Sequence, residues 1–291
     1  MTCHATVVIP TSIDRGPLLR YSVASVLRQT LPDIEVFIIG DGAHPVTAEI
    51  AVELEKRDSR VRFFEYPKGT RRGETHRHEV LTTHASGQIV CYLCDRDLML
   101  PHHVARMHLA LSEHDFANSA YLDIRQDGRV LPQFPFDSGD PVQRARLACR
   151  GHMGMMLSTM AHRLDFYRTL PYGWRTTPEG WFTDHYMQHQ MLSERTCRSI
   201  GVATASIAYF KRGHHPGLPT QDREKELAQW EGILNDSSAL AEILLSGLEV
   251  VLADRLAQRE RLRYRLLVAG HPPGTAATLL LRRLLRRKDS P

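Results

Sequence analysis

The first 125 residues alternate between short apolar runs and segments with helical spacing, and this alternation allows few architectures. Nearly continuous apolar runs occupy 6–9, 35–39 and 89–94. Such runs are typical of parallel strands buried on both faces, and helical segments between them indicate strand–helix–strand units. The sequence therefore predicts an α/β fold, with a mainly parallel sheet covered by helices on both faces and a helical region after it.

Polar side chains follow the ends of three predicted strands: Thr11, Asp41 and the pair Asp95 and Asp97. Because ligands bind beyond the carboxyl ends of strands in such sheets, we expect these residues to line one site. Paired carboxylates suit Mg²⁺ or Mn²⁺, which bridge phosphate oxygens, and Asp41 can accept hydrogen bonds from a nucleobase or a ribose. The alternatives are a solvated turn that caps the next helix and an ordinary Asp-Gly turn.

Two phosphate-binding motifs are missing from the sequence. No G-x-G-x-x-G follows the first predicted strand, and no G-x-x-x-x-G-K-[ST] is found in the chain. Their absence argues against a doubly wound, NAD-binding oxidoreductase. Observed binding of NAD would restore that hypothesis.

The charge of the chain is concentrated at its C-terminal end. Residues 251–291 hold ten Lys or Arg against three acids, and the rest of the chain is slightly acidic. The main body therefore gives no support for nucleic-acid binding. The segment 279–288 is a basic amphipathic helix candidate, which either docks on an anionic membrane surface or packs on the body with its arginines in water. The C-terminal helices could also form a homodimer.

Cysteine and histidine patterns favour no metal or redox chemistry. Five cysteines are an odd, sparse set, and Cys91 and Cys94 are expected on opposite faces of one buried strand. His185 and His189 are spaced as in a zinc-binding helix, but Tyr186 stands where such a site has its glutamate. With no secretory signal and no apolar run of about 18 residues, we expect a cytoplasmic protein.

A resemblance emerges from a series of short motifs that follow one another in order. They are Val7 to Thr11, Ser25 to Thr30, Glu35-Val36, Gly40 to Gly42, Asp58 to Arg62, Gly87 to Val90, and Leu93 to Asp97 with Leu100-Pro101. Together they resemble the family 2 glycosyltransferases, which have the Rossmann-like GT-A fold. The resemblance is close over about 5–112 and weaker to about 218. It implies a GT-A domain over 1–218, with a nucleotide-sugar half (1–125) and an acceptor half (126–218), before a helical extension (219–291).

The resemblance implies transfer of a sugar, with inversion, from a nucleoside-diphosphate donor, most often a UDP-sugar. Thr11 and Asp41 match residues that contact the base, and Arg77 matches an arginine near the nucleotide. Asp95 and Asp97 match the acidic cluster that holds ribose and Mn²⁺ or Mg²⁺. A glycan or a lipid-linked acceptor would receive the sugar, in polysaccharide or glycoconjugate synthesis, with the enzyme in the cytoplasm or at the inner face of the membrane.

Two further site residues are expected in the second half of the chain. Direct displacement needs a base for the acceptor hydroxyl, and Asp184, at the start of a predicted helix, resembles the family's base; Glu179 is the reserve. The alternative for Asp184 is an ordinary first-turn acid that the helix dipole stabilises. His215 resembles a family histidine that reaches the diphosphate or metal, and the alternative is a solvated loop histidine.

The sequence departs from the family pattern at three positions: Gly40, Ala43 and, above all, Arg96. Arg96 stands where the family most often has the acid that binds the metal. Three hypotheses follow: Asp97 takes over the metal, Arg96 itself neutralises the diphosphate, or catalysis is impaired and the chain is a nucleotide-sugar-binding protein.

Overall fold

The computed structural model describes residues 3–13, 15–134, 136–147, 155–210 and 218–268. Within these residues nine strands form one sheet, in the order β3-β2-β1-β4-β8-β6-β9-β5, with β7 paired to β6. The strands are β1 (Ala5–Ile13), β2 (Ile34–Ala43), β3 (Val61–Tyr66), β4 (Ile89–Tyr92), β5 (Leu98–Met99), β6 (Phe116–Ile124), β7 (Val130–Gln133), β8 (Met160–Arg163) and β9 (Ser199–Tyr209).

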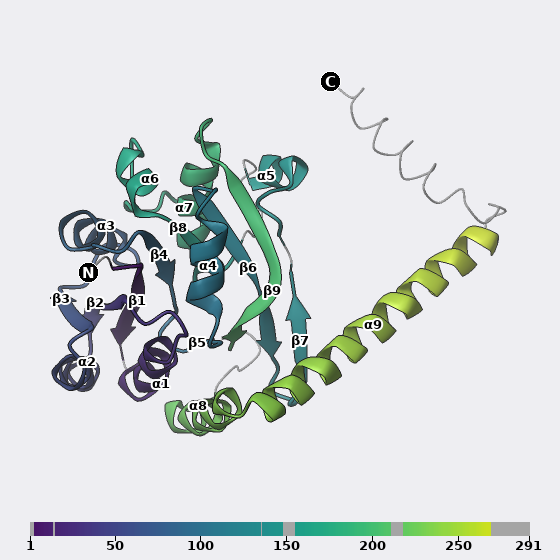
Figure 1. Ribbon diagram of the computed structural model, residues 1–291, viewed down its shortest axis with the longest axis horizontal. Helices are drawn as coiled ribbons and strands as arrows, with labels where there is room; N and C mark the ends of the chain where they lie inside the picture. Colours follow the sequence, from purple (N-terminus) through teal and green to yellow (C-terminus); the bar gives the residue numbers. More distant parts are fainter. Residues whose placement is uncertain (1–2, 14, 135, 148–154, 211–217, 269–291) are drawn as a thin grey trace.

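Helices surround the sheet, and the last of them extends away from it (Figure 1). They are α1 (Gly16–Leu27), α2 (Pro45–Arg57), α3 (Glu74–Thr83), α4 (His103–Ala110), α5 (Pro141–Leu147), α6 (Leu164–Thr169), α7 (Thr183–Ser193), α8 (Thr220–Asn235) and α9 (Ser237–Val268), with a 3₁₀ turn η1 (Leu157–Thr159). None of the helices in the described ranges has the length and apolarity needed to cross a bilayer.

The α/β prediction is confirmed, and the sheet is parallel where the alternation of strands and helices predicted it. Strands β3, β2, β1 and β4 pair in parallel, because each crossover between them carries a helix. Strand β8 then runs antiparallel to both β4 and β6, so the second half of the sheet is mixed. Strands β6 and β7 form a hairpin around Asp127-Gly128, with Ile124 opposite Val130.

The alternation of side chains along β1 divides the core into two layers. Val7 and Ile9 pack with α1, α2 and α4, whereas Val8 points to the other face, toward α3, α6 and α7. Both layers are almost completely buried. The N-terminal strands are thus fixed from two sides, and the loops at their carboxyl ends are held in place by a rigid frame.

The strand expected to reach Cys94 is shorter than the sequence suggested. Strand β4 ends at Tyr92, so Cys91 is buried in the strand and Cys94 lies half-buried in the following loop, not on the opposite face of one strand. Leu93 still donates its backbone N–H to the Val8 carbonyl of β1 (3.0 Å), whereas Cys94 donates its backbone N–H to Ser158 Oγ (3.0 Å). The described cysteines are all free thiols.

Helix α8 closes the bottom of the sheet as Figure 1 draws it. Leu227, Trp230 and Leu234 pack against residues of β5, β6 and β9 in a third apolar cluster. Helix α9 begins beside β7, where Gly247 approaches the carbonyl of Val130, and its second half leaves the body. The segment 279–288 lies outside the described residues.

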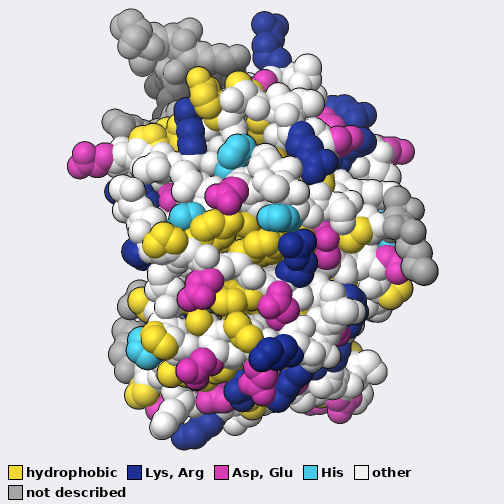
Figure 2. All heavy atoms as spheres, turned by 90° about the vertical axis from the view of Figure 1, so that its left-hand side faces the viewer, with side chains coloured by type: hydrophobic (Ala, Val, Ile, Leu, Met, Phe, Trp, Pro, Cys, Tyr) yellow, Lys and Arg dark blue, Asp and Glu magenta, His cyan; other side chains and the backbone are white. Residues whose placement is uncertain are grey.

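The face of the molecule that carries α2, α3 and β3 has no dominant charge. Figure 2 shows basic and acidic side chains interspersed there, with apolar and polar groups between them. This mixture offers no basic surface that a nucleic acid would follow.

Candidate active site

Thr11 and Asp95 meet at the carboxyl ends of β1 and β4, as the sequence predicted. Thr11 Oγ1 donates a hydrogen bond to Asp95 Oδ2 (2.9 Å), and both side chains are buried. The backbone N–H of Ser12 also donates to the Asp95 carboxylate. Burial raises the pKa of Asp95, and the positive charges of Arg96 and Arg15 oppose that rise.

Asp41 lies at the end of β2, where it holds the segment between β3 and α3. Its carboxylate accepts hydrogen bonds from Lys68 Nζ (2.6 Å) and from the backbone N–H of Gly69 (2.6 Å). Gly73 has a left-handed φ of 68°, and a Cβ there would lie 2.9 Å from Asp41 Cγ, so only glycine fits. Asp41 therefore orders the loop that leads into the Arg77 helix.

Arg77 is buried with part of its guanidinium unused. Nη2 donates to the carbonyl of Arg72 (2.6 Å), and the guanidinium lies over the Trp174 ring, 4.7 Å from its centroid. Nε and Nη1 are buried and have no hydrogen-bond partner among the described residues. Unpaired buried donors are costly, so an anionic ligand would relieve an existing penalty here.

Asp97 is completely buried and makes internal hydrogen bonds with both oxygens. Oδ2 accepts from Ser158 Oγ (2.6 Å), and Oδ1 accepts from the backbone N–H of Phe210 (3.2 Å). Its backbone carbonyl accepts from Ser22 Oγ (3.0 Å). Burial raises the pKa of Asp97, and the charge of Arg96 opposes this. Asp97 thus ties the acidic loop to η1, to the end of β9 and to α1.

Asp184 lies in the first turn of α7, close to the same group of residues. The backbone N–H of Leu157 donates to its carboxylate, while the next residue, Ser158, binds Asp97. Burial raises the pKa of Asp184, and Arg77, Arg72 and Arg96 oppose the rise. The turn η1 therefore brings the predicted base and the acidic loop together.

Two parts of this site escaped the sequence analysis. The turn η1 follows a stretch rich in methionine and apolar residues, with no local pattern that marks a functional role. The other is Glu74, whose Oε1 accepts from Thr177 Oγ1 (2.6 Å) and Thr183 Oγ1 (3.2 Å), at the residue before Asp184. Burial alone would raise the pKa of Glu74, but the hydrogen bonds, led by that of Thr177, lower it. Glu74 stays charged and joins α3 to the start of α7.

The remaining predicted residues are not brought into this group. Glu179 is exposed on the turn before α7, and His215 lies outside the described residues. His185 and His189 lie against the Trp181 ring. Across the part of the chain that the structure describes, no three His, Cys, Asp or Glu side chains are arranged to hold a metal ion.

This fold recurs in glycosyltransferases of known structure. Residues 1–349 of TarS from S. aureus, in complex with UDP-GlcNAc, share 15% identity and a TM-score of 0.55 over 84% of this chain and 71% of that one. A mannosyltransferase from Pyrobaculum calidifontis, PcManGT, in complex with GDP-Man and Mn²⁺, shares 15% identity and a TM-score of 0.50 over 91% and 83%. The fold is therefore that of the GT-A glycosyltransferases.

The family itself follows from the sequence match. The model of glycosyl transferase family 2 matches residues 6–168, more than half of the chain, so this protein belongs to glycosyl transferase family 2. The uncharacterized glycosyltransferase EpsJ of Bacillus subtilis is 40% identical over 53 residues, which span 18% of this chain and 15% of EpsJ.

The family resemblance implies a divalent metal at the acidic loop that holds Asp95 and Asp97. Asp97, the expected ligand, has no exposed surface, and both its oxygens already accept hydrogen bonds. Asp95 is bound to Thr11 and Ser12, and a guanidinium separates the two acids in sequence. The described donors do not fit Mg²⁺ or Mn²⁺, which need accessible oxygen ligands.

Proposed function

We propose that this protein is an inverting glycosyltransferase that moves a sugar from a nucleoside-diphosphate donor, with UDP-sugars as the first choice, to an acceptor hydroxyl. The observation that carries the proposal is the convergence of Asp184 with Arg77 and with the loop that follows Asp95. A carboxylate of raised pKa near Arg77, Arg72 and Arg96 suits proton abstraction next to a phosphate leaving group. Solved relatives with UDP-GlcNAc and with GDP-Man support a nucleotide-sugar donor.

In the proposed reaction the acceptor oxygen attacks the anomeric carbon from the face opposite the diphosphate. The bond from that carbon to the phosphate oxygen breaks, and its electron pair stays on the diphosphate. Asp184 takes the acceptor proton, while Arg77, with its unpaired Nε and Nη1, stabilises the anion. Thr11, Asp41 and Asp95 hold the base and ribose, in a glycan or lipid-linked pathway of polysaccharide or glycoconjugate synthesis.

Thermal unfolding with UDP, GDP, CDP, dTDP and NAD, each with Mn²⁺ or with chelator, tests donor binding. A nucleotide at about 100 times its dissociation constant should add about 2.7 kcal/mol to the free energy of unfolding. Stabilisation by one nucleoside diphosphate would support the proposal and identify the base. Stabilisation by NAD alone would replace it with the oxidoreductase hypothesis.

A second candidate is a nucleotide-sugar-binding protein without catalysis, favoured by Arg96 within the acidic loop. Incubation of the stabilising nucleotide's sugar conjugates with acceptors separates the two candidates. Release of free nucleoside diphosphate, with sugar appearing on an acceptor, would exclude the second candidate, whereas tight binding without turnover would favour it.

A further inference from the structure

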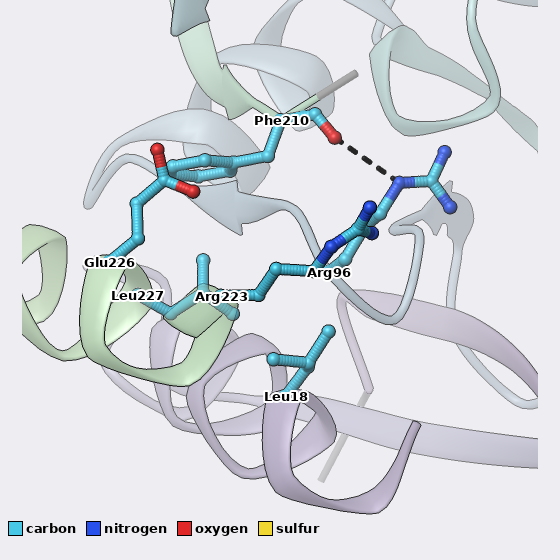
Figure 3. Close-up of a pocket in the computed structure, with 6 residues that line it drawn as sticks. All are labelled: Leu18, Arg96, Phe210, Arg223, Glu226 and Leu227. Carbon is cyan, nitrogen blue, oxygen red and sulfur yellow. Dashed lines mark hydrogen bonds between the residues drawn. The ribbon is translucent and has the colours of Figure 1, made fainter. Parts of the chain in front are cut away.

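Arg96 lies at the centre of the acidic loop, and its guanidinium is fixed at one edge only. Nε donates to the carbonyl of Phe210 (3.3 Å), and the two terminal nitrogens make no hydrogen bond to a described residue. Figure 3 shows these nitrogens turned away from the Phe210 carbonyl and away from Leu18, which lines a small pocket together with the Arg96 and Arg223 side chains. The Arg96 guanidinium is therefore held by one hydrogen bond, and its terminal N–H groups can donate to a ligand.

The surroundings of Arg96 keep it charged. Burial alone would lower the pKa of Arg96, but the neighbouring Cys94, Asp97 and Asp95 raise it above its ordinary value. The guanidinium also lies close enough to Asp184 to lower the pKa of that carboxyl. A permanent cation therefore lies on the acidic loop, near enough to the proposed base to influence its pKa.

We propose that the Arg96 guanidinium supplies the positive charge that receives the diphosphate, so that donor binding and transfer need no divalent ion. The inference rests on the proposed function. Arginine matches phosphate geometry through paired N–H donors. The two acids that would otherwise hold a metal serve other purposes: Asp97 braces the loop, and Asp95 is fixed by Thr11.

Calorimetric titration with the nucleoside diphosphate that stabilises the protein tests this, in excess Mn²⁺ and in chelator. For the unmodified protein we expect dissociation constants within about twofold of each other. Arg96→Gln should weaken binding about 10- to 100-fold in both conditions, the loss typical of a charged hydrogen bond. Arg96→Asp, which adds a carboxylate to the loop, should bind appreciably only with Mn²⁺. Arg28→Gln, at an exposed ion pair with Glu231, is the matched control.

The outcomes separate the two proposals. If the unmodified protein binds the nucleotide only with Mn²⁺, the role of Arg96 is overturned while the proposed function stands. If Arg96→Gln binds as tightly as the unmodified protein, the role of Arg96 is likewise overturned. If no nucleoside diphosphate binds under either condition, both proposals fail.

A second inference rests on a different observation, the apolar surface of α9. The exposed large hydrophobic side chains on this helix are Leu245, Leu248, Val250, Leu252, Leu256, Leu262 and Tyr264. Four of the leucines recur at spacings of three and four residues, so they form one stripe along the helix. Their exposed fractions lie between 50% and 61%. The stripe faces away from the body, which contacts Leu240, Ile243 and Leu244.

The charges on α9 are divided along its length. Residues 237–251 carry Glu242 and Glu249 and no Lys or Arg, whereas residues 252–265 carry five arginines and two acids. Two such helices attract each other when they lie antiparallel. Acids beside the leucines also make an anionic membrane a poor occupant of the stripe.

We infer that the α9 stripe pairs, antiparallel, with the same stripe of a second copy of this chain. In the register that pairs Leu248 with Leu256 and Leu252 with itself, Glu249 of one copy lies level with Arg255 of the other. Interface leucines with flanking complementary charges are the usual basis of helix pairing and its orientation.

Light scattering after size exclusion measures the mass of the full chain. We expect a dimer that Leu252→Glu converts to a monomer, with Leu109→Glu, at an exposed leucine of α4, as control. Glu249→Arg and Arg255→Glu should each weaken the dimer, and the double variant should restore it. A monomeric unmodified protein overturns the inference. So does a monomer whose α9 leucines instead drive binding to phosphatidylserine vesicles.

Discussion

At the scale of single residues, the site depends on charges held under unfavourable conditions. Asp95 and Asp97 are buried and Asp184 is half-buried, and this loss of contact with water raises the pKa of all three carboxyls. Nearby arginines and hydrogen bonds reduce the free-energy cost of keeping these carboxylates ionised in the folded protein, but they do not remove it. Active sites commonly hold such groups at the expense of stability.

The first prediction concerns Asp184, which we propose as the base. Asp184→Asn keeps the size of the side chain and removes its ability to take a proton. Transfer should fall by at least about 100-fold, the lower end of what a positioned base contributes. Nucleotide affinity, measured by calorimetry, should remain within a few fold. Transfer at the unmodified rate would remove Asp184 from the mechanism, and Glu179→Gln would then be the next variant.

The second prediction follows from the direction of the Asp184 pKa shift. Because the folded-state pKa lies above the unfolded value, the ionised carboxylate destabilises the folded protein at neutral pH. Asp184→Asn should therefore raise the unfolding free energy at pH 7. The difference in unfolding free energy between the variant and the unmodified protein should shrink as the pH falls through the folded-state pKa. It should disappear below the unfolded-state pKa, where the carboxyl is protonated in both states.

Urea unfolding of both proteins at several pH values between neutral and acidic conditions measures this difference. The prediction is contradicted if Asp184→Asn has a lower unfolding free energy than the unmodified protein at pH 7 and the difference does not shrink in acid. The ionised carboxylate would then stabilise the folded protein.

At the scale of elements, the turn η1 is the piece that joins the two halves of the site. Leu157 and Ser158 are adjacent, yet one binds the base and the other binds the acidic loop. Glu74 makes a parallel link from α3 to α7. The position of α7 is thus set by side-chain hydrogen bonds as well as by packing.

The third prediction tests this connection with Ser158→Ala. Loss of the hydroxyl leaves a fully buried Asp97 carboxylate oxygen without its shortest hydrogen bond. We expect a loss of about 1–3 kcal/mol in urea unfolding, the usual cost of an unpaired buried polar group. Ser112→Ala removes an exposed hydroxyl of α4's end and should change stability by less than about 0.5 kcal/mol. Equal effects at both positions would contradict the role of η1.

These elements also show how far the sequence could lead. The strands and the residues at their ends were predictable, because apolar runs and the positions that follow them are local features. The roles of Ser158 and Glu74 were not, since their partners Asp97 and Thr183 lie 61 and 109 residues away. The residues around Ser158 and Glu74 in the sequence form no local pattern that would distinguish either from a surface residue.

At the scale of the whole molecule, one sheet carries both halves of the proposed enzyme. The parallel strands that position Thr11, Asp41 and Asp95 continue through β4 and β8 into the mixed half, above which α7 holds Asp184. The Mg²⁺ or Mn²⁺ site on Asp97 stays a prediction that the hydrogen bonds of the described residues do not favour. Both oxygens of the Asp97 carboxylate accept hydrogen bonds that connect the acidic loop to the end of β9 and to η1.

The placement of the three tryptophans has an optical consequence. Trp174 lies under the Arg77 guanidinium, Trp181 lies beside α7, and Trp230 is buried in α8. Indole emission responds to nearby charge and hydration, so the molecule carries one native fluorophore beside Arg77, one beside α7, which holds the proposed base, and one in α8. In variants that each keep one tryptophan, a change in its emission wavelength or intensity would therefore report on one event. Trp174 would report on donor binding, Trp181 on acceptor binding and Trp230 on changes in the C-terminal helices.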